Sequence, residues 1–248
     1  MSQEYYLDGE FPMTLQTGMI AADGWLLASD RRNIEQSNQP DGSVATLATD
    51  VRKIELRPSG INVAYSCAGS GAVRQAAIQL TDRLMTMNMP WSNLANEFAG
   101  IAASNSLPIF GAIGANRLIV VCFGREVDEP QMWTVDLMSG QLKLPERVHQ
   151  WAIAGEFHSG ARLLPQLYYS KRSCNDLTRL AAFTILYGHF FNPSGIGGLD
   201  ILIGKQGMPP RFLSDKELDR LREEFDAFDQ TMASAFLTTV PALRHYRP

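Results

Sequence analysis

The spacing of apolar and polar positions changes its period several times along the chain. Short alternating or continuous apolar runs predict strands, and apolar residues three and four apart predict helices. Strands are expected at 51–56, 61–68, 109–113, 118–123, 132–136, 149–154 and 199–203. Helices are expected at about 72–87, 91–103, 160–170 and 176–190, and after the capping-box sequence at 214–217. Hairpin-linked strands separated by helix pairs predict a layered α+β fold.

The clearest local signal is a hairpin over residues 13–32. Asp23-Gly24 stands between two apolar runs, and both residues tolerate the positive φ of a tight hairpin turn. Side chains alternate between the two faces of a strand, so Asp30 is expected at the end of the second run, on a face that apolar residues share. Arg32 follows two residues later on that face.

Two stretches lack any hydrophobic period. Residues 33–50 are rich in Asn, Gln, Asp, Gly and Ser, and they predict a long polar loop. Residues 1–13 are polar and aromatic, and they are interpreted either as a propeptide or as a surface arm that stays attached. The remainder, 14–248, shows no second boundary and predicts a single domain.

Composition narrows the class of protein. The 248 residues include 45% hydrophobic residues, enough for an ordinary globular core, and the net charge of −4 gives no electrostatic case for nucleic acid. No apolar run is long enough for a transmembrane helix, and the acidic N-terminus does not resemble a signal peptide. Three widely spaced cysteines predict buried thiols in a reducing cytoplasm. The four histidines are not at metal-ligand spacing, so no metal site is expected.

The ordered set Thr14, Gly18, Asp23-Gly24, Asp30-x-Arg32 and Lys53 resembles the opening of proteasome β subunits and bacterial proteasome-type peptidases. This resemblance to N-terminal nucleophile hydrolases covers the first third of the chain well and the rest loosely. It implies a four-layer αββα sandwich, with two antiparallel sheets between helix layers. It also implies a peptide or protein substrate, a homo-oligomeric ring, and neither metal nor cofactor.

The same resemblance assigns roles to individual residues. A threonine at the mature N-terminus carries its own base, the free α-amine. Thr14 would be nucleophile and base, Lys53 would favour the neutral amine by like-charge repulsion, and Asp30 would anchor the lysine. The N–H of Gly69 would stabilise the oxyanion. The supporting residues would be Arg32, Ser159 and Ser194.

Three functions follow from this resemblance. The first is a threonine-type peptidase that forms an acyl-threonine intermediate. The second is a non-catalytic, proteasome-like structural subunit that keeps residues 1–13, and the third is an amidohydrolase of a small amide. The chain departs from the family pattern at Leu15 and Gln16, where small hydroxyl residues are usual, and before Gly197-Gly198, where an aspartate and a serine are usual.

Overall fold

The chain divides into two compact units, Met1–Phe212 and Leu213–Pro248. A computed structural model describes residues 14–38, 41, 43–57, 62–68, 117–123, 129–136, 146–155, 164, 167–169 and 171–239. This division does not test the single domain expected over 14–248, which stays a prediction. The extension at 1–13 and the helices expected at 72–87 and 91–103 lie outside the described residues, as does the strand expected at 109–113.

The first sheet contains the predicted hairpin. Its strand order is β10-β1-β2-β11-β12, and every neighbouring pair is antiparallel. Asp23 and Gly24 form the turn between the first two strands, as the sequence indicated. The strands are β1 (Leu15–Ala21), β2 (Gly24–Ser29), β10 (Trp151–Gly155), β11 (Asp200–Lys205) and β12 (Arg211–Phe212).

The second sheet is an antiparallel meander with the order β5-β6-β7-β8-β9. Its register aligns Ile54 with Ser66 and Ile119 with Thr134. The strands are β5 (Ile54–Arg57), β6 (Asn62–Cys67), β7 (Arg117–Phe123), β8 (Gln131–Asp136) and β9 (Glu146–Val148).

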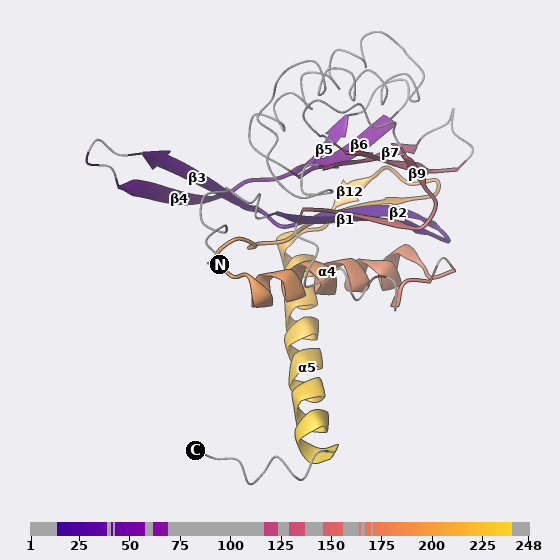
Figure 1. The fold of residues 1–248 in the computed structure, drawn as a ribbon. Helices are drawn as coiled ribbons and strands as arrows, with labels where there is room; N and C mark the ends of the chain where they lie inside the picture. The colour runs from indigo at the N-terminus through magenta and orange to yellow at the C-terminus, as the bar shows by residue number, and fades with distance from the viewer. Residues whose placement is uncertain are drawn as a thin grey trace, which may run out of the picture. The chain divides into compact units, whose positions relative to one another are not determined.

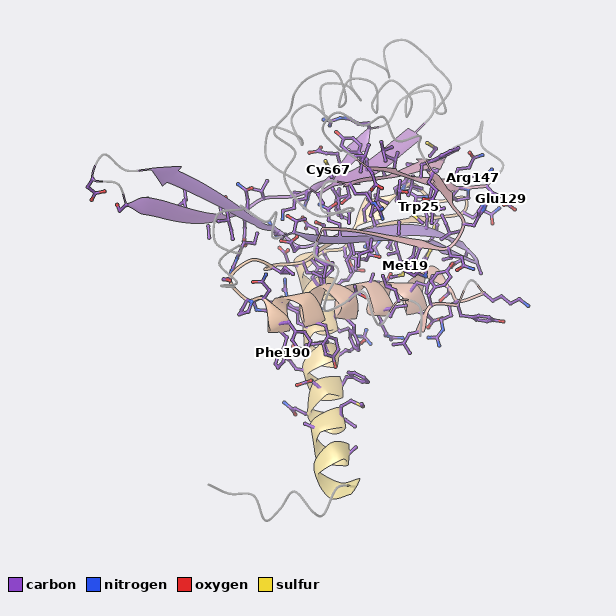
Figure 2. The ribbon with its side chains drawn as sticks, in the orientation of Figure 1. Met19, Trp25, Cys67, Glu129, Arg147 and Phe190 are labelled. Atoms are coloured by element: carbon purple, nitrogen blue, oxygen red, sulfur yellow. The ribbon has the colours of Figure 1, made fainter. Side chains whose placement is uncertain are left out.

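The two sheets pack face to face around an apolar core (Figure 1). Trp25 and Leu27 of β2 meet Ile119 and Met132 of the second sheet there, and Figure 2 shows Trp25 between the sheets. Burying each such side chain contributes about 1.5–3 kcal/mol. A Cβ at Gly18 would lie 2.7 Å from the sulfur of Met132 and 2.9 Å from Cγ2 of Ile119, so a larger residue would force these side chains to shift.

Helix α4 (Cys174–Phe191) packs on the other face of the first sheet, against β1, β2 and β11 (Figure 1). Its buried face includes the positions that the helical period predicted, Leu177, Leu180, Ala181 and Ile185. The N-cap Ser173 accepts a hydrogen bond from the N–H of Asp176. The carboxylate of Asp23, in the β1–β2 turn, accepts another from the N–H of Cys174 at 2.6 Å.

The expected long loop at 33–50 is wrong. Strands β3 (Arg32–Asn38) and β4 (Val44–Asp50) pair along their whole length and form a separate two-stranded sheet, seen at the left of Figure 1. The described side chains of β4 are exposed or half-buried, and Leu47 is 58% exposed. A ribbon with little buried surface has no need of apolar alternation, so its sequence gave no strand signal.

The four-layer αββα sandwich is also wrong. The described residues hold twelve strands in three sheets and two helices, of which α4 alone belongs to the first unit. In that unit the described layers are one helix, a five-stranded sheet and a second five-stranded sheet, with the β3–β4 ribbon as an addition. The prediction took the layers from the family resemblance, and it counted polar residues 33–50 as a loop.

The second unit contains helix α5 (Asp215–Thr239). The predicted capping box is confirmed, because Ser214 Oγ accepts from the N–H of Glu217 and Glu217 Oε2 accepts from the N–H of Ser214. Neither described helix is long and apolar enough to cross a membrane.

Candidate active site

Three polar side chains from separate segments meet at one end of the first sheet. Thr14 immediately precedes β1, Asp30 immediately follows β2, and Lys53 immediately precedes β5. The hairpin register pairs Gln16 with Ser29, which brings the two ends of the hairpin side by side. The N–H of Asp30 then donates to the carbonyl of Leu15 at 3.0 Å. The Asp-Gly turn therefore determines the distance between Thr14 and Asp30, which are sixteen positions apart in the sequence.

Lys53 connects Thr14 to Asp30. Its Nζ donates to Thr14 Oγ1 at 2.8 Å and to both oxygens of Asp30 at 3.0 and 2.9 Å. Asp30 also accepts from the N–H of Leu15 at 3.0 Å and from the N–H of Arg32 at 3.1 Å. The carboxylate is thus held by two backbone donors while it holds the ammonium against the threonine hydroxyl.

The cluster is buried. Thr14 is 7% exposed, Asp30 0% and Lys53 6%. Burial raises the pKa of the Asp30 carboxyl above its ordinary value, while the Lys53 ammonium and the N–H groups of Leu15 and Arg32 act in the opposite direction. In such surroundings an unpaired charge is costly, so the pair of Asp30 and Lys53 acts as one unit.

Gly155, the last residue of β10, lies against the backbone of Thr14. The register pairs it with Leu15, and its φ is +91°, a conformation that glycine adopts without strain. Gly155 is not among the site residues predicted from the sequence. The available signal was a glycine at the end of an apolar run, which marks a special backbone position.

Arg32 connects the cluster to the loop before β11. Its Nη1 donates to the carbonyl of Pro193 at 2.5 Å, and its N–H donates to the carbonyl of Gly197 at 3.0 Å. A Cβ at Gly197 would lie 2.7 Å from Arg32 Nε, so this glycine makes room for the guanidinium. Arg32 therefore holds the loop by donating to two of its backbone carbonyls. It contacts Asp30 through its backbone N–H.

The remaining predicted site residues have different outcomes. Gly69 and Ser159 lie outside the described residues. Ser194 is exposed, and its hydroxyl donates to Asn192 Oδ1 at 3.1 Å within its own loop. The supporting role of Ser194 stays a prediction. Asp200, after Gly197-Gly198, is buried and pairs with Arg52 at 3.5 Å.

A second buried polar group lies beside the cluster. Gln16 in β1 is fully buried; its Oε1 accepts from Ser66 Oγ, and its Nε2 donates to the carbonyl of Cys67 at 2.8 Å. In the sequence, Gln16 stood out only as a departure from the family pattern. A glutamine inside an apolar strand was the available signal, because a buried polar side chain needs a hydrogen-bond partner.

No group of three or more His, Cys, Asp or Glu side chains suited to a metal ion occurs among the residues that the structure describes. The site's own chemistry is that of a hydroxyl, an ammonium and a carboxylate in hydrogen-bond contact.

Known proteins resemble this chain in structure but not detectably in sequence. No family model and no curated protein matches it. Anbu from Hyphomicrobium sp. strain MC1 has a TM-score of 0.68 at 14% identity, over 90% of this chain and 96% of that one. Anbu (ancestral beta-subunit) from Yersinia bercovieri has the same TM-score, identity and coverage. The helical assembly of the Anbu complex from Pseudomonas aeruginosa has a TM-score of 0.65 at 17% identity, over 89% and 96% of the two chains.

The chain has an Anbu-like fold. This likeness corrects the family that the sequence indicated. Identification as a proteasome β subunit or bacterial proteasome-type peptidase is wrong, because the similar structures are Anbu proteins, one of which is described as an ancestral beta-subunit. At 14–17% identity the likeness establishes the fold alone, so activity must be argued from this chain's own residues.

Proposed function

We propose that this protein is a threonine-type N-terminal nucleophile hydrolase that cleaves amide bonds, with peptides as its substrate class. The observation that carries the proposal is the buried contact of Thr14 Oγ1 with Lys53 Nζ at 2.8 Å, with Asp30 holding the lysine from the other side. A threonine nucleophile is activated by its own N-terminal amine, and Lys53, oriented by Asp30, lies within hydrogen-bond reach of the hydroxyl that this amine would activate.

The reaction proceeds in two steps. The Thr14 hydroxyl adds to the substrate carbonyl while its proton passes to the α-amine of Thr14, and the same proton then goes to the departing amine as the carbon–nitrogen bond breaks. Water next adds to the resulting ester, and the α-amine again takes and returns a proton as the carbon–Oγ bond breaks. General acid–base transfer of this kind contributes about 10²- to 10⁴-fold in rate.

Lys53 and Asp30 prepare the amine for this work. A free α-amine has an ordinary pKa of about 7.7–8.0, so most of it is protonated at neutral pH. A nearby ammonium disfavours a second positive charge, so Lys53 favours the neutral amine that can accept a proton. Asp30 holds the lysine in place through hydrogen bonds of 3.0 and 2.9 Å, and its negative charge favours the protonated lysine.

The mechanism requires Thr14 to be the N-terminal residue. While residues 1–13 are attached, the nitrogen of Thr14 belongs to an amide, which has no basic lone pair. Met13 directly precedes Thr14, so translation from Met13 followed by removal of that methionine would expose the amine. Cleavage of a longer chain between Met13 and Thr14 would give the same product.

We further propose that the protein acts as a homo-oligomer well above a dimer, in the cytoplasm. One of the similar structures is a helical assembly, which supports self-association here. The three cysteines are buried free thiols, as expected for a reducing compartment. A closed ring, as the sequence resemblance implied, and an open helix are both compatible with this proposal.

The direct test compares two proteins, one beginning at Thr14 and one retaining residues 1–13, in hydrolysis of fluorogenic peptides and of small amides. The proposal predicts turnover only by the first, with peptides as the better substrates. Inertness of both would support a non-catalytic subunit, and turnover of small amides alone would support an amidohydrolase of small substrates.

A further inference from the structure

We propose that Gln16 is a positioning residue for Thr14 and Lys53, an inference that rests on the proposed function. Its side-chain amide is fully buried, and both of its ends are engaged by one neighbouring strand. Oε1 accepts from Ser66 Oγ, and Nε2 donates to the carbonyl of Cys67 at 2.8 Å. Gln16 belongs to β1 of the first sheet, whereas Ser66 and Cys67 belong to β6 of the second.

These bonds connect the sheet that carries Thr14 to the sheet that carries Lys53. Thr14 lies two residues before Gln16, and side chains two apart on a strand share a face. On the other side, Ser66 pairs with Ile54, and Lys53 is the residue directly before Ile54. The hydrogen bond between Gln16 and Ser66 therefore connects the two sheets, next to Thr14 on one side and next to Lys53 on the other.

We call the hydrogen bonds of Gln16 with Ser66 and Cys67 the brace. The brace matters because Thr14 and Lys53 must stay in contact although they adjoin two separate sheets. Lys53 acts on the α-amine of Thr14 through its charge, and its hydrogen bond to Thr14 Oγ1 at 2.8 Å holds that charge beside the nucleophile. A misplacement of about 1 Å, even one caused away from the chemistry, can cost about 100-fold in rate. A buried, fully satisfied polar pair also fixes one arrangement of the strands, because any sliding would leave polar atoms without partners.

The chain offers a matched control in the adjacent residue. Thr17 is also fully buried in β1, and its Oγ1 donates to the carbonyl of Ala152 at 2.9 Å. That bond joins β1 to β10 within the first sheet, so it does not connect the sheets. Thr17→Val removes a buried hydrogen bond from the same strand and leaves the brace intact.

The experiment uses protein that begins at Thr14 and compares Gln16→Leu, Ser66→Ala and Thr17→Val with the wild type. For Gln16→Leu we expect kcat to fall about 10- to 100-fold with KM changed less than about twofold. The acidic limb of its kcat/KM profile should also move to higher pH, because an amine farther from Lys53 regains a pKa nearer its ordinary value. Ser66→Ala should show a smaller fall in kcat and a smaller shift of the acidic limb. Thr17→Val should show neither change.

The outcomes separate this inference from the proposed function. If the wild type turns over and Thr14→Ala does not, but both Gln16→Leu and Ser66→Ala keep kcat and the pH profile, the brace is overturned and the proposed function stands. If Thr17→Val lowers kcat and moves the profile as much as Gln16→Leu, general loss of stability explains both and the brace is again overturned. If Gln16→Leu does not fold, Ser66→Ala decides. Inactive wild-type protein would instead overturn the proposed function.

Discussion

A Cβ atom on Gly155 would lie 1.7 Å from the carbonyl oxygen of Thr14. No real Cβ atom tolerates such a contact with a backbone atom, so any larger residue at this position must displace one of the two strands. The φ of +91° adds a second restriction, since L-residues rarely adopt it. Gly155 is therefore a structural requirement of the proposed nucleophile's position.

This relationship predicts that Gly155→Ala lowers kcat strongly as well as stability. The φ strain alone costs about 1–2 kcal/mol, and displacement of Thr14 is added to it. Gly207→Ala is a matched control, because Gly207 has φ +75° but, apart from its chain neighbours, nothing lies within 4 Å of its Cβ position. Denaturant unfolding and peptide hydrolysis should show that both variants lose stability but only Gly155→Ala loses turnover. Equal turnover in the two variants would contradict this prediction.

The buried pair of Lys53 and Asp30 predicts a separation of stability from activity. Lys53→Met leaves a buried carboxyl without its partner, which costs about 3–5 kcal/mol, and the variant should lose turnover by about 10²- to 10⁴-fold. Lys53→Met/Asp30→Asn should regain much of the stability, because no lone charge remains, and none of the turnover. Recovery of turnover in the double variant would show that the lysine is not part of the mechanism.

The same variants should differ in pH dependence. Without the lysine, the pKa of the folded Asp30 carboxyl rises further above its ordinary value of 3.8, while the unfolded carboxyl keeps that value. The folded state then binds the proton more tightly, so the free energy of unfolding of Lys53→Met falls as pH rises above about 4. The double variant lacks this carboxyl and should lack this fall. Urea unfolding at several pH values measures both.

The three cysteines should be dispensable for activity. All are buried free thiols, and burial raises the pKa of Cys122 and, to about 12, that of Cys174. Thiolate is the reactive form, so native protein should resist iodoacetamide at neutral pH and keep its turnover, while denatured protein should react at three sites. Mass spectrometry and hydrolysis assays test this. Rapid inactivation by iodoacetamide would point to a cysteine nucleophile instead.

Self-association is the prediction that concerns the protein's surface. Phe190 and Phe191, at the end of α4, are 63% and 64% exposed, and exposed apolar groups of this kind favour protein contacts. Light scattering over a micromolar dilution series should give a mass well above that of a dimer. A stable monomer throughout the series would rule out the proposed oligomer.

Local signals in the sequence predicted the β1–β2 hairpin and helix α4 well. Asp23-Gly24 determined the turn, the turn determined the β1–β2 register, and the register brought Asp30 beside Thr14. The helical period predicted α4 to within two residues at its N-terminal end and one at its C-terminal end. These features depend on residues close in sequence, which is why a pattern could reveal them.

Features that depend on contacts between distant segments were missed. Gly155 meets Thr14, and Gln16 meets Ser66, across 141 and 50 positions of sequence. The β3–β4 ribbon was missed for a different reason, because its strands pair through their backbones with little apolar burial. Backbone pairing and long-range steric fit have little effect on the spacing of apolar and polar residues, so a single sequence gives little indication of them.

The central claim is that Thr14 acts with its own α-amine. The most direct measurement is peptide hydrolysis by three proteins of verified intact mass: one that begins at Thr14, the same protein with Thr14→Ala, and one that retains residues 1–13. The account predicts turnover by the first alone, with all three in the same oligomeric state. Equal turnover by the Thr14→Ala protein, or by the protein that keeps residues 1–13, would contradict it.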